Sequence, residues 1–210
     1  MNTLSWSVSD GVGQLRLIRP EKRNAQNLEM WAELRQVGYD IIRAGETRAL
    51  VLSGEGPVFS AGIDLGLLMG QATGEAASLP AVEQVQHAFT WLRDAPFATV
   101  AAVHGAALGA GAQLALACDL RIFAEGTVFG LPEIDFGIFP DLGGCAWLPG
   151  LIGTARAKAL IFTGDRIDAA EALRLGIANQ VVPNEGLLAA ATALAARLAA
   201  KAPLGIAAAK

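Results

Sequence analysis

The stretch from Ala95 to Cys118 contains no Asp, Glu, Lys or Arg. A helix of that length would be long enough to cross a lipid bilayer. The stretch nevertheless contains Pro96, His104, Gln113 and a cluster of glycines, and its first part has the composition of a short buried strand. We therefore predict a strand, a tight turn and a small-residue helix inside a protein core, and no membrane segment.

Strand-like and helix-like patterns alternate along the chain. Residues 4–20 read as two strands joined at Asp10-Gly11, a pair typical of tight hairpins. Residues 27–45 place apolar side chains three and four positions apart, which predicts an amphipathic helix that ends at Gly45. The later elements are predicted in the order strand 47–56, loop 54–74, helix 81–93, strand 98–105, helix 111–119, strands within 120–130, helices 154–164 and 168–176, strand 177–183 and helix 185–201. This alternation predicts a single α/β domain over residues 1–210.

The charge balance argues against a general nucleic-acid-binding surface. The chain has 16 Lys and Arg against 20 Asp and Glu, a net charge of −4, and the sequence shows no large basic face. The first ten residues have neither the basic nor the apolar segment of a secretory signal, so we expect a cytoplasmic protein. Cys118 and Cys145 lie among apolar neighbours without disulfide or metal-ligand spacing, which predicts two reduced cysteines packed in the core.

Two turns rich in small residues are candidates for binding a substrate oxygen. The segments "FSAGIDL" (59–65) and "HGAALGAGAQL" (104–114) each follow a predicted strand and expose backbone N–H groups. Two such groups directed at one oxygen would form an oxyanion hole. From the local sequence alone, a pair of purely structural turns is the alternative. A dinucleotide site is not supported, because Leu114 stands where the GxGxxG pattern requires its third glycine.

The segment "GLPEIDFGIFPDLGG" (130–144) places Glu133, Asp135 and Asp141 among glycine, proline and apolar residues. Carboxylates are scarce in such surroundings, so each needs a reason to be there. Asp135 is predicted to cap or turn the end of the preceding strand. For Asp141 two interpretations stay open, a catalytic carboxylate and an N-cap of the helix that follows.

Five segments, in this order along the chain, resemble the enoyl-CoA hydratase/isomerase family, the crotonase superfamily. They are "RPEKRNAQN" (19–27), "FSAGIDL" (59–65), "HGAALGAGAQLALACDLRIF" (104–123), "FGLPEIDFGIFPDLGG" (129–144) and "TGDRIDAAEALRLGIANQVVP" (163–183). The resemblance covers nearly the whole chain. It implies an α/β, crotonase-like spiral of ββα turns with flanking helices, and an acyl-CoA thioester as substrate. It implies no metal, nicotinamide or flavin, because coenzyme A enters only as part of the thioester.

The resemblance also assigns binding roles to individual residues. It implies that the backbone N–H groups of Ile63 and Ala110 form the oxyanion hole for the thioester carbonyl. It places the adenine end of coenzyme A against the backbone of Ala61, Gly62, Asp64 and Leu65, and it brings Lys22 or Arg23 to the phosphates. For Lys22 and Arg23, a solvated loop charge is the alternative.

The same resemblance makes the acid and base positions decide the reaction. Family hydratases hold one water between two glutamates, and here Gln113 stands at the first of these positions and Glu133 at the second. An amide orients water but exchanges no proton with substrate. Glu133 alone is enough to move a proton between two carbons, and Asp141 stands where some isomerases of the family carry a catalytic aspartate. We therefore predict isomerisation, with hydration and a catalytically silent acyl-CoA-binding protein as alternatives.

One further expectation concerns the carboxyl-terminal part of the chain, which ends in "APLGIAAAK". Family members usually continue in helices that close the acyl pocket and pack between subunits. We therefore expect the carboxyl-terminal helical part to be short or truncated here. A homotrimer or hexamer is expected if those helices are present.

Overall fold

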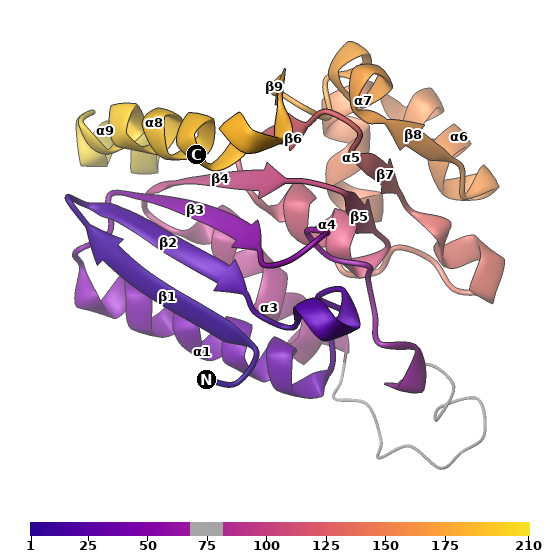
Figure 1. Ribbon diagram of the computed structural model, residues 1–210, viewed down its shortest axis with the longest axis horizontal. Helices are drawn as coiled ribbons and strands as arrows, with labels where there is room; N and C mark the ends of the chain where they lie inside the picture. Colours follow the sequence, from indigo (N-terminus) through magenta and orange to yellow (C-terminus); the bar gives the residue numbers. More distant parts are fainter. Residues whose placement is uncertain (68–81) are drawn as a thin grey trace.

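The computed structural model describes residues 1–67 and 82–210, and its centre is a six-stranded sheet (Figure 1). The strands lie in the order β1-β2-β3-β4-β6-β9, with bounds β1 Leu4–Ser9, β2 Val12–Leu17, β3 Ala49–Gly54, β4 Ala98–Val103, β6 Leu120–Ala124 and β9 Gln180–Val182. Strands β1 and β2 are antiparallel, and every other neighbouring pair is parallel. The positive φ angles of Asp10 (51°) and Gly11 (75°) confirm the predicted hairpin.

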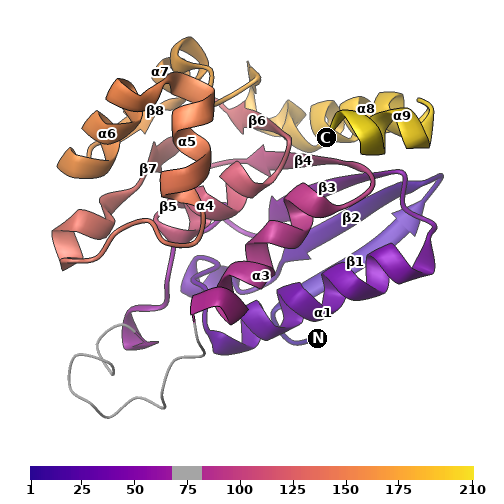
Figure 2. The same ribbon diagram turned by 180° about the vertical axis from the view of Figure 1, so that it is seen from behind.

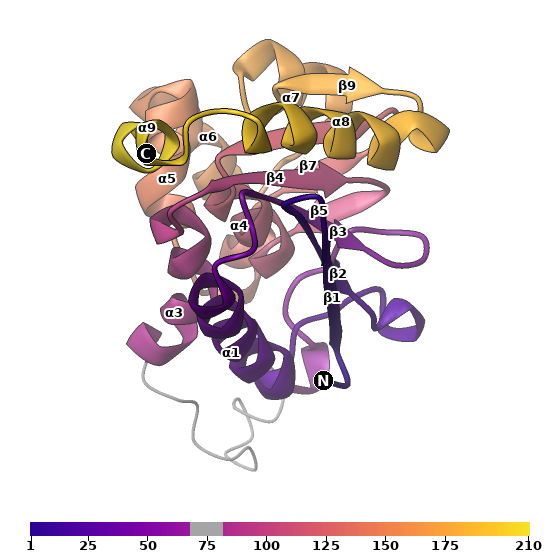
Figure 3. The same cartoon turned by 90° about the vertical axis from the view of Figure 1, so that its left-hand side faces the viewer.

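Both faces of the central strands are buried, which explains why these strands are almost entirely apolar. In β3, Leu50 and Leu52 pack with the core on one face, while Ala49 and Val51 pack with that on the other. The first face is covered by α1 (Leu28–Ala44), α3 (Val82–Asp94) and α4 (Ala110–Ala117), and the second by α8 (Leu187–Ala199) (Figure 3). The uncharged stretch 95–118 therefore holds a buried strand and a buried helix, as predicted, and a short strand, β5 (Ala106–Leu108), lies where only a turn was expected.

A second sheet, of three strands, lies at one end of the molecule (Figure 2). It consists of β5 (Ala106–Leu108), β7 (Val128–Gly130) and β8 (Arg166–Asp168), and the helices nearby are α5 (Gly144–Ile152), α6 (Thr154–Thr163) and α7 (Ala169–Leu175). Three short 3-10 helices lie at η1 (Pro20–Lys22), η2 (Pro132–Phe136) and η3 (Asn184–Gly186). The sequence predicted α6, α7 and the strand β7, but it did not predict β5, β8 or the sheet that the three strands form, because a strand of three residues carries little periodicity.

Side-chain oxygens cap the first turns of two helices. Asn27 accepts a hydrogen bond from the Met30 N–H at the start of α1, and Asp168 accepts one from the Glu171 N–H at the start of α7. Gly45 closes α1 in the left-handed conformation. The helices α1 and α7 therefore begin where the sequence predicted them to begin.

Three features differ from the sequence predictions or extend them. Cys118 is buried as predicted, but Cys145 is exposed, because α5 turns that side of its first residues outward. The final residues form a helix, α9 (Pro203–Ala209), and the Lys210 side chain hydrogen-bonds to the carbonyls of Leu92 and Phe97. The part of the predicted loop beyond residue 67 lies outside the described residues.

Within residues 1–67 and 82–210, no single helix is long and apolar enough to span a membrane. One pair bent by 106°, residues 184–199 with 203–209, meets the length and composition criteria together.

Candidate active site

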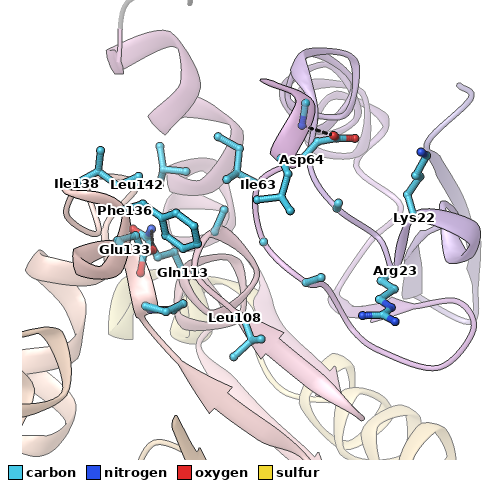
Figure 4. A pocket seen from close by; sticks show the side chains of 18 of the residues that line it. Lys22, Arg23, Ile63, Asp64, Leu108, Gln113, Glu133, Phe136, Ile138 and Leu142 are labelled. Atoms are coloured by element: carbon cyan, nitrogen blue, oxygen red, sulfur yellow. Dashed lines mark hydrogen bonds between the residues drawn. The ribbon is translucent and has the colours of Figure 1, made fainter. Parts of the chain in front are cut away.

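A cavity of about 610 Å³ opens between η1, residues 61–66, the start of α4, and the segment from η2 to residue 142 (Figure 4). Its lining includes every site residue that the sequence predicted, namely Lys22, Arg23, Ala61, Gly62, Ile63, Asp64, Leu65, Ala110, Gln113, Glu133 and Asp141. These residues come from distant parts of the chain. The fold therefore brings the predicted candidates together around one space.

The two small-residue turns lie against each other because a backbone ladder joins them. The Ser60 N–H donates to the Ala106 carbonyl over 3.0 Å, and the Leu108 N–H donates to the Ser60 carbonyl over 3.1 Å. Gly62 has a φ of 102°, and a Cβ there would lie 2.7 Å from the Leu108 carbonyl oxygen. Only glycine allows this close approach, which sets the turn before Ile63 beside the start of α4.

Ile63 and Ala110 line the cavity, and their backbone N–H groups have no acceptor among the described residues. Neither donates to a protein acceptor within residues 1–67 and 82–210, although the neighbouring N–H groups of Asp64 and Gly109 do. Ala110 is the first residue of α4, so its N–H has no partner inside the helix. Two free N–H groups on the wall of one cavity are the donors that an anionic oxygen needs.

Glu133 lies in η2, which starts at Pro132 and is closed by Gly137 in the left-handed conformation. Its side chain is buried, with 7% of the residue exposed. The Oε1 atom accepts a hydrogen bond of 2.7 Å from Gln113 Nε2, while Oε2 is buried without a hydrogen-bond partner among the described residues. Burial raises the pKa of Glu133 to about 7, although hydrogen bonds from its own backbone and from Gln113 oppose the rise.

Gln113 lies in α4 and is almost fully buried, with 1% of the residue exposed. Its Oε1 atom accepts a hydrogen bond of 3.0 Å from the N–H of Gly144, the first residue of α5. The amide therefore connects α5 with Glu133. Where the family resemblance places a second glutamate, this chain has the neutral amide of Gln113. Its oxygen and its nitrogen both form hydrogen bonds within the protein.

Asp141 lies between η2 and α5 and lines the cavity. The N-cap residue of α5 is Gly143, so the helix-cap interpretation of Asp141 is wrong. Burial raises the pKa of Asp141, and its negative charge in turn raises the pKa of Glu133. Asp135, on the exposed side of η2, is outside the cavity lining.

The opposite wall of the cavity is charged and open to solvent. Lys22 and Arg23 are exposed at the end of η1, and neither forms an ion pair with any described residue. Asp64 is different, because Arg19 pairs with its carboxylate over 3.3 Å and compensates its charge. Figure 4 shows Lys22 and Arg23 across the cavity from Glu133 and Gln113. A ligand bound here would have one end in a cationic region and the other beside a buried carboxyl.

Several lining residues were missed by the sequence analysis. Phe136, Ile138 and Leu142 form an apolar surface beside Glu133, and Arg166 reaches the cavity from β8. The apolar residues between Glu133 and Asp141 were a signal in the sequence. Arg166 gave none, because only the pairing of β8 with β7 brings it here.

No metal centre is found in the part of the chain that the structure describes. Among those residues, no group of three His, Cys, Asp or Glu side chains lies close enough to hold an ion.

The chain is similar to known proteins of one family. The family model for enoyl-CoA hydratase/isomerase matches residues 7–210. The "Probable enoyl-CoA hydratase 2, mitochondrial" of Arabidopsis thaliana is 38% identical, over 100% of this chain and 69% of its own length. The human mitochondrial Δ(3,5)-Δ(2,4)-dienoyl-CoA isomerase is 35% identical, over 95% of this chain and 64% of its own.

A solved structure shows the same relationship in three dimensions. The "putative enoyl-CoA hydratase" of Thermobifida fusca, in complex with acetoacetyl-CoA, matches with a TM-score of 0.88 and 37% identity. The match covers 99% of this chain and 84% of that one. The chain therefore belongs to the enoyl-CoA hydratase/isomerase family and has the crotonase fold that the sequence predicted.

Proposed function

We propose that this enzyme shifts the carbon–carbon double bond of an enoyl-CoA thioester by proton transfer through Glu133. The observation that carries this proposal is the pairing of one buried carboxyl with an amide. Glu133 has a pKa near 7, and its buried hydrogen-bond partner is Gln113 rather than a second acid. Such a group exchanges a proton readily near neutral pH, whereas an amide partner exchanges none.

The free N–H groups of Ile63 and Ala110 bind the thioester carbonyl oxygen in this proposal. They stabilise the negative charge that develops on this oxygen when a proton leaves C2. Backbone donors are already fixed in place, because the ladder between the two turns holds them before substrate arrives. The complex of a relative with acetoacetyl-CoA supports an acyl-CoA ligand in a site of this fold.

The reaction then proceeds in two proton transfers. Ionised Glu133 removes a proton from C2 of a 3-enoyl-CoA, and the electron pair delocalises into a dienolate held by the two N–H groups. The same carboxyl returns the proton to C4, so the double bond moves to C2–C3 and Glu133 is ionised again. Burial is the main cause of the raised pKa of Glu133, and the charge of Asp141 adds a smaller contribution in the same direction.

Substrate binding uses the charged wall of the cavity. Lys22 and Arg23 contact the phosphates of coenzyme A, and its adenine end lies against the backbone of residues 61–65. These two cations form no ion pair with any described residue, which supports this placement. The proposed reaction uses no metal or redox cofactor, and coenzyme A enters only as part of the substrate.

We also propose that the protein is a homotrimer or hexamer if the family's carboxyl-terminal helices are present. Large apolar side chains are exposed, including Phe139 at 61% and Phe162 at 66%, and a contiguous patch of such side chains would mark a contact between chains. Light scattering at several protein concentrations tests this, and a monomer at all of them would contradict it.

Hydration is the alternative reaction, because some relatives are named hydratases. Purified protein is therefore offered 3-enoyl-CoA and 2-enoyl-CoA in separate reactions, and products are separated by chromatography. We expect conversion of the first substrate to the second, with little 3-hydroxyacyl-CoA from either. Efficient hydration of 2-enoyl-CoA would overturn the proposal, and tight binding without turnover would favour a silent acyl-CoA-binding protein.

A further inference from the structure

The side-chain amide of Gln113 can adopt only one orientation in its site. Its neighbour at 3.0 Å is the backbone N–H of Gly144, which can donate a hydrogen bond but cannot accept one. The atom facing Gly144 must therefore be the amide oxygen. The NH₂ group consequently faces Glu133 and donates to Oε1 over 2.7 Å.

Close packing prevents this amide from turning away. A Cβ at Gly144 would lie 3.2 Å from both Cγ and Oε1 of Gln113 and 2.7 Å from Cβ of Pro140. Gln113 is itself 1% exposed. Glycine at 144 thus lets the first N–H of α5 reach a side chain of α4, and the two helices hold the amide between them.

The two oxygens of Glu133 are made unequal by this arrangement. Oε1 is occupied by the Gln113 NH₂ group, while Oε2 is buried without a hydrogen-bond partner among the described residues. A proton on Oε1 would turn this oxygen into a hydroxyl, which is a poorer acceptor for the Gln113 NH₂ group, and would weaken the hydrogen bond. A proton on Oε2 meets no such donor, so Oε2 is the oxygen able to carry it.

We infer that Gln113 is a positioning residue that, through its hydrogen bond from Gly144, holds Oε1 of Glu133 and leaves Oε2 as the single oxygen that exchanges protons with substrate. This inference rests on the proposed role of Glu133 as the proton-transfer group. It assigns Gln113 a task different from that of an acid, because its amide neither gives nor takes a proton during turnover. Fixing one oxygen matters, since small errors in placing a reacting group reduce rates strongly.

Two variants test the role of the Gln113 hydrogen bond. Gln113→Met keeps the length of the side chain but removes both polar ends. Gln113→Glu keeps the acceptor for the Gly144 N–H but cannot donate to Glu133 when ionised. We expect the rate constant kcat for the double-bond shift to fall about 10- to 100-fold in both variants, with a smaller change in KM.

A control separates positioning from general destabilisation of α4. Leu116→Ala removes buried apolar contacts on the same helix, and Leu116 is not part of the cavity lining. We expect this variant to lose thermal stability while its kcat stays within about twofold of the wild type. A fall in kcat like that of the Gln113 variants would show that loosening α4 is sufficient, and would overturn the positioning role.

The decisive readout is the titration of the Glu133 carboxyl itself, followed by NMR of ¹³C-glutamate-labelled protein and assigned by comparison with Glu133→Gln. Loss of the Gln113 hydrogen bond favours the protonated form, so Glu133 should titrate at higher pH in Gln113→Met and unchanged in Leu116→Ala. An unshifted titration in Gln113→Met would overturn the inference, and if that variant fails to fold, an unchanged titration and kcat in Gln113→Glu would do the same. This readout needs no turnover. A shifted titration in a protein that does not isomerise enoyl-CoA would reject the proposed function while retaining the contact.

Discussion

The two walls of the cavity use charge in opposite ways. On the η1 wall, Lys22 and Arg23 are exposed and unpaired among the described residues. On the η2 wall, Glu133 is buried against an amide, and burial raises its pKa to about 7. Water and salt screen the first kind of charge, so each exposed cation contributes little. The second kind is sensitive to every neighbour, and we expect the chemistry to depend on that wall.

The largest effect on turnover is expected from replacing the buried carboxyl of Glu133. Glu133→Gln keeps the shape of the side chain and an acceptor for Gln113, but it exchanges no proton. We expect kcat for the double-bond shift to fall by about 10³-fold, within the usual range for a general acid or base, while acyl-CoA binding measured by calorimetry is retained. Asp135→Asn, on the exposed side of the same 3-10 helix, is the matched control and should leave kcat unchanged. Full turnover by Glu133→Gln would identify a different base.

The same substitution should stabilise the protein at alkaline pH. The pKa of Glu133 is about 7 in the folded protein against an ordinary 4.5, so the folded state binds the proton more tightly than the unfolded state does. Its contribution to stability is complete below about pH 4.5 and is lost as pH rises to about 7. Glu133→Gln avoids this loss, so its free energy of unfolding at pH 8 should exceed that of the wild type by up to about 3 kcal/mol. Equal free energies of unfolding for the wild type and Glu133→Gln at pH 8, measured by urea titration, would contradict the raised pKa of Glu133.

A smaller effect is expected at Asp141, which influences the buried wall through its charge. Asp141→Asn removes a like charge near Glu133, so the pKa of Glu133 should fall. Because the ionised form of Glu133 removes the proton, the rising limb of the kcat/KM profile should move to lower pH. We expect kcat at alkaline pH to fall as well, since a less basic carboxylate removes the proton more slowly. An unchanged pH profile would place Asp141 outside the catalytic machinery.

The smallest effect is expected on the exposed wall. The double variant Lys22→Ala/Arg23→Ala should raise KM for an enoyl-CoA about 3- to 10-fold at low salt, with the difference shrinking as salt is added. With an enoyl-pantetheine, which lacks the nucleotide phosphates, wild type and variant should behave alike. An equal loss with both substrates would mean that these cations do not contact the nucleotide part.

Local patterns predicted the main elements because their signals are local. The helix over 28–44 has its own periodicity and caps, and the strand over 98–103 has its apolar run. The strands β5 and β8 of the second sheet and the 3-10 helix that carries Glu133 are too short to leave such a signal. They are stabilised by contacts with distant parts of the chain.

The site could be predicted only in part, for the same reason. The site residues were identified by resemblance to the family. Their contacts were not, because Gln113 and Glu133 lie twenty residues apart in the sequence. The Gly144 N–H, which donates to Gln113, comes from a third segment. Cys145 was misplaced because an apolar neighbourhood in sequence does not reveal which side of a helix faces solvent. Of the two interpretations of Asp141, the N-cap is wrong because Gly143, two residues later, is the N-cap of α5.

The central claim is that Glu133 moves a proton between two carbons of the substrate and that the enzyme adds no water. It is tested most directly by incubating the wild-type enzyme with 3-enoyl-CoA in oxygen-18 water and analysing the products by mass spectrometry. The account predicts 2-enoyl-CoA as the main product, with no heavy oxygen in its acyl chain. A main product of 3-hydroxyacyl-CoA carrying oxygen-18 would contradict it.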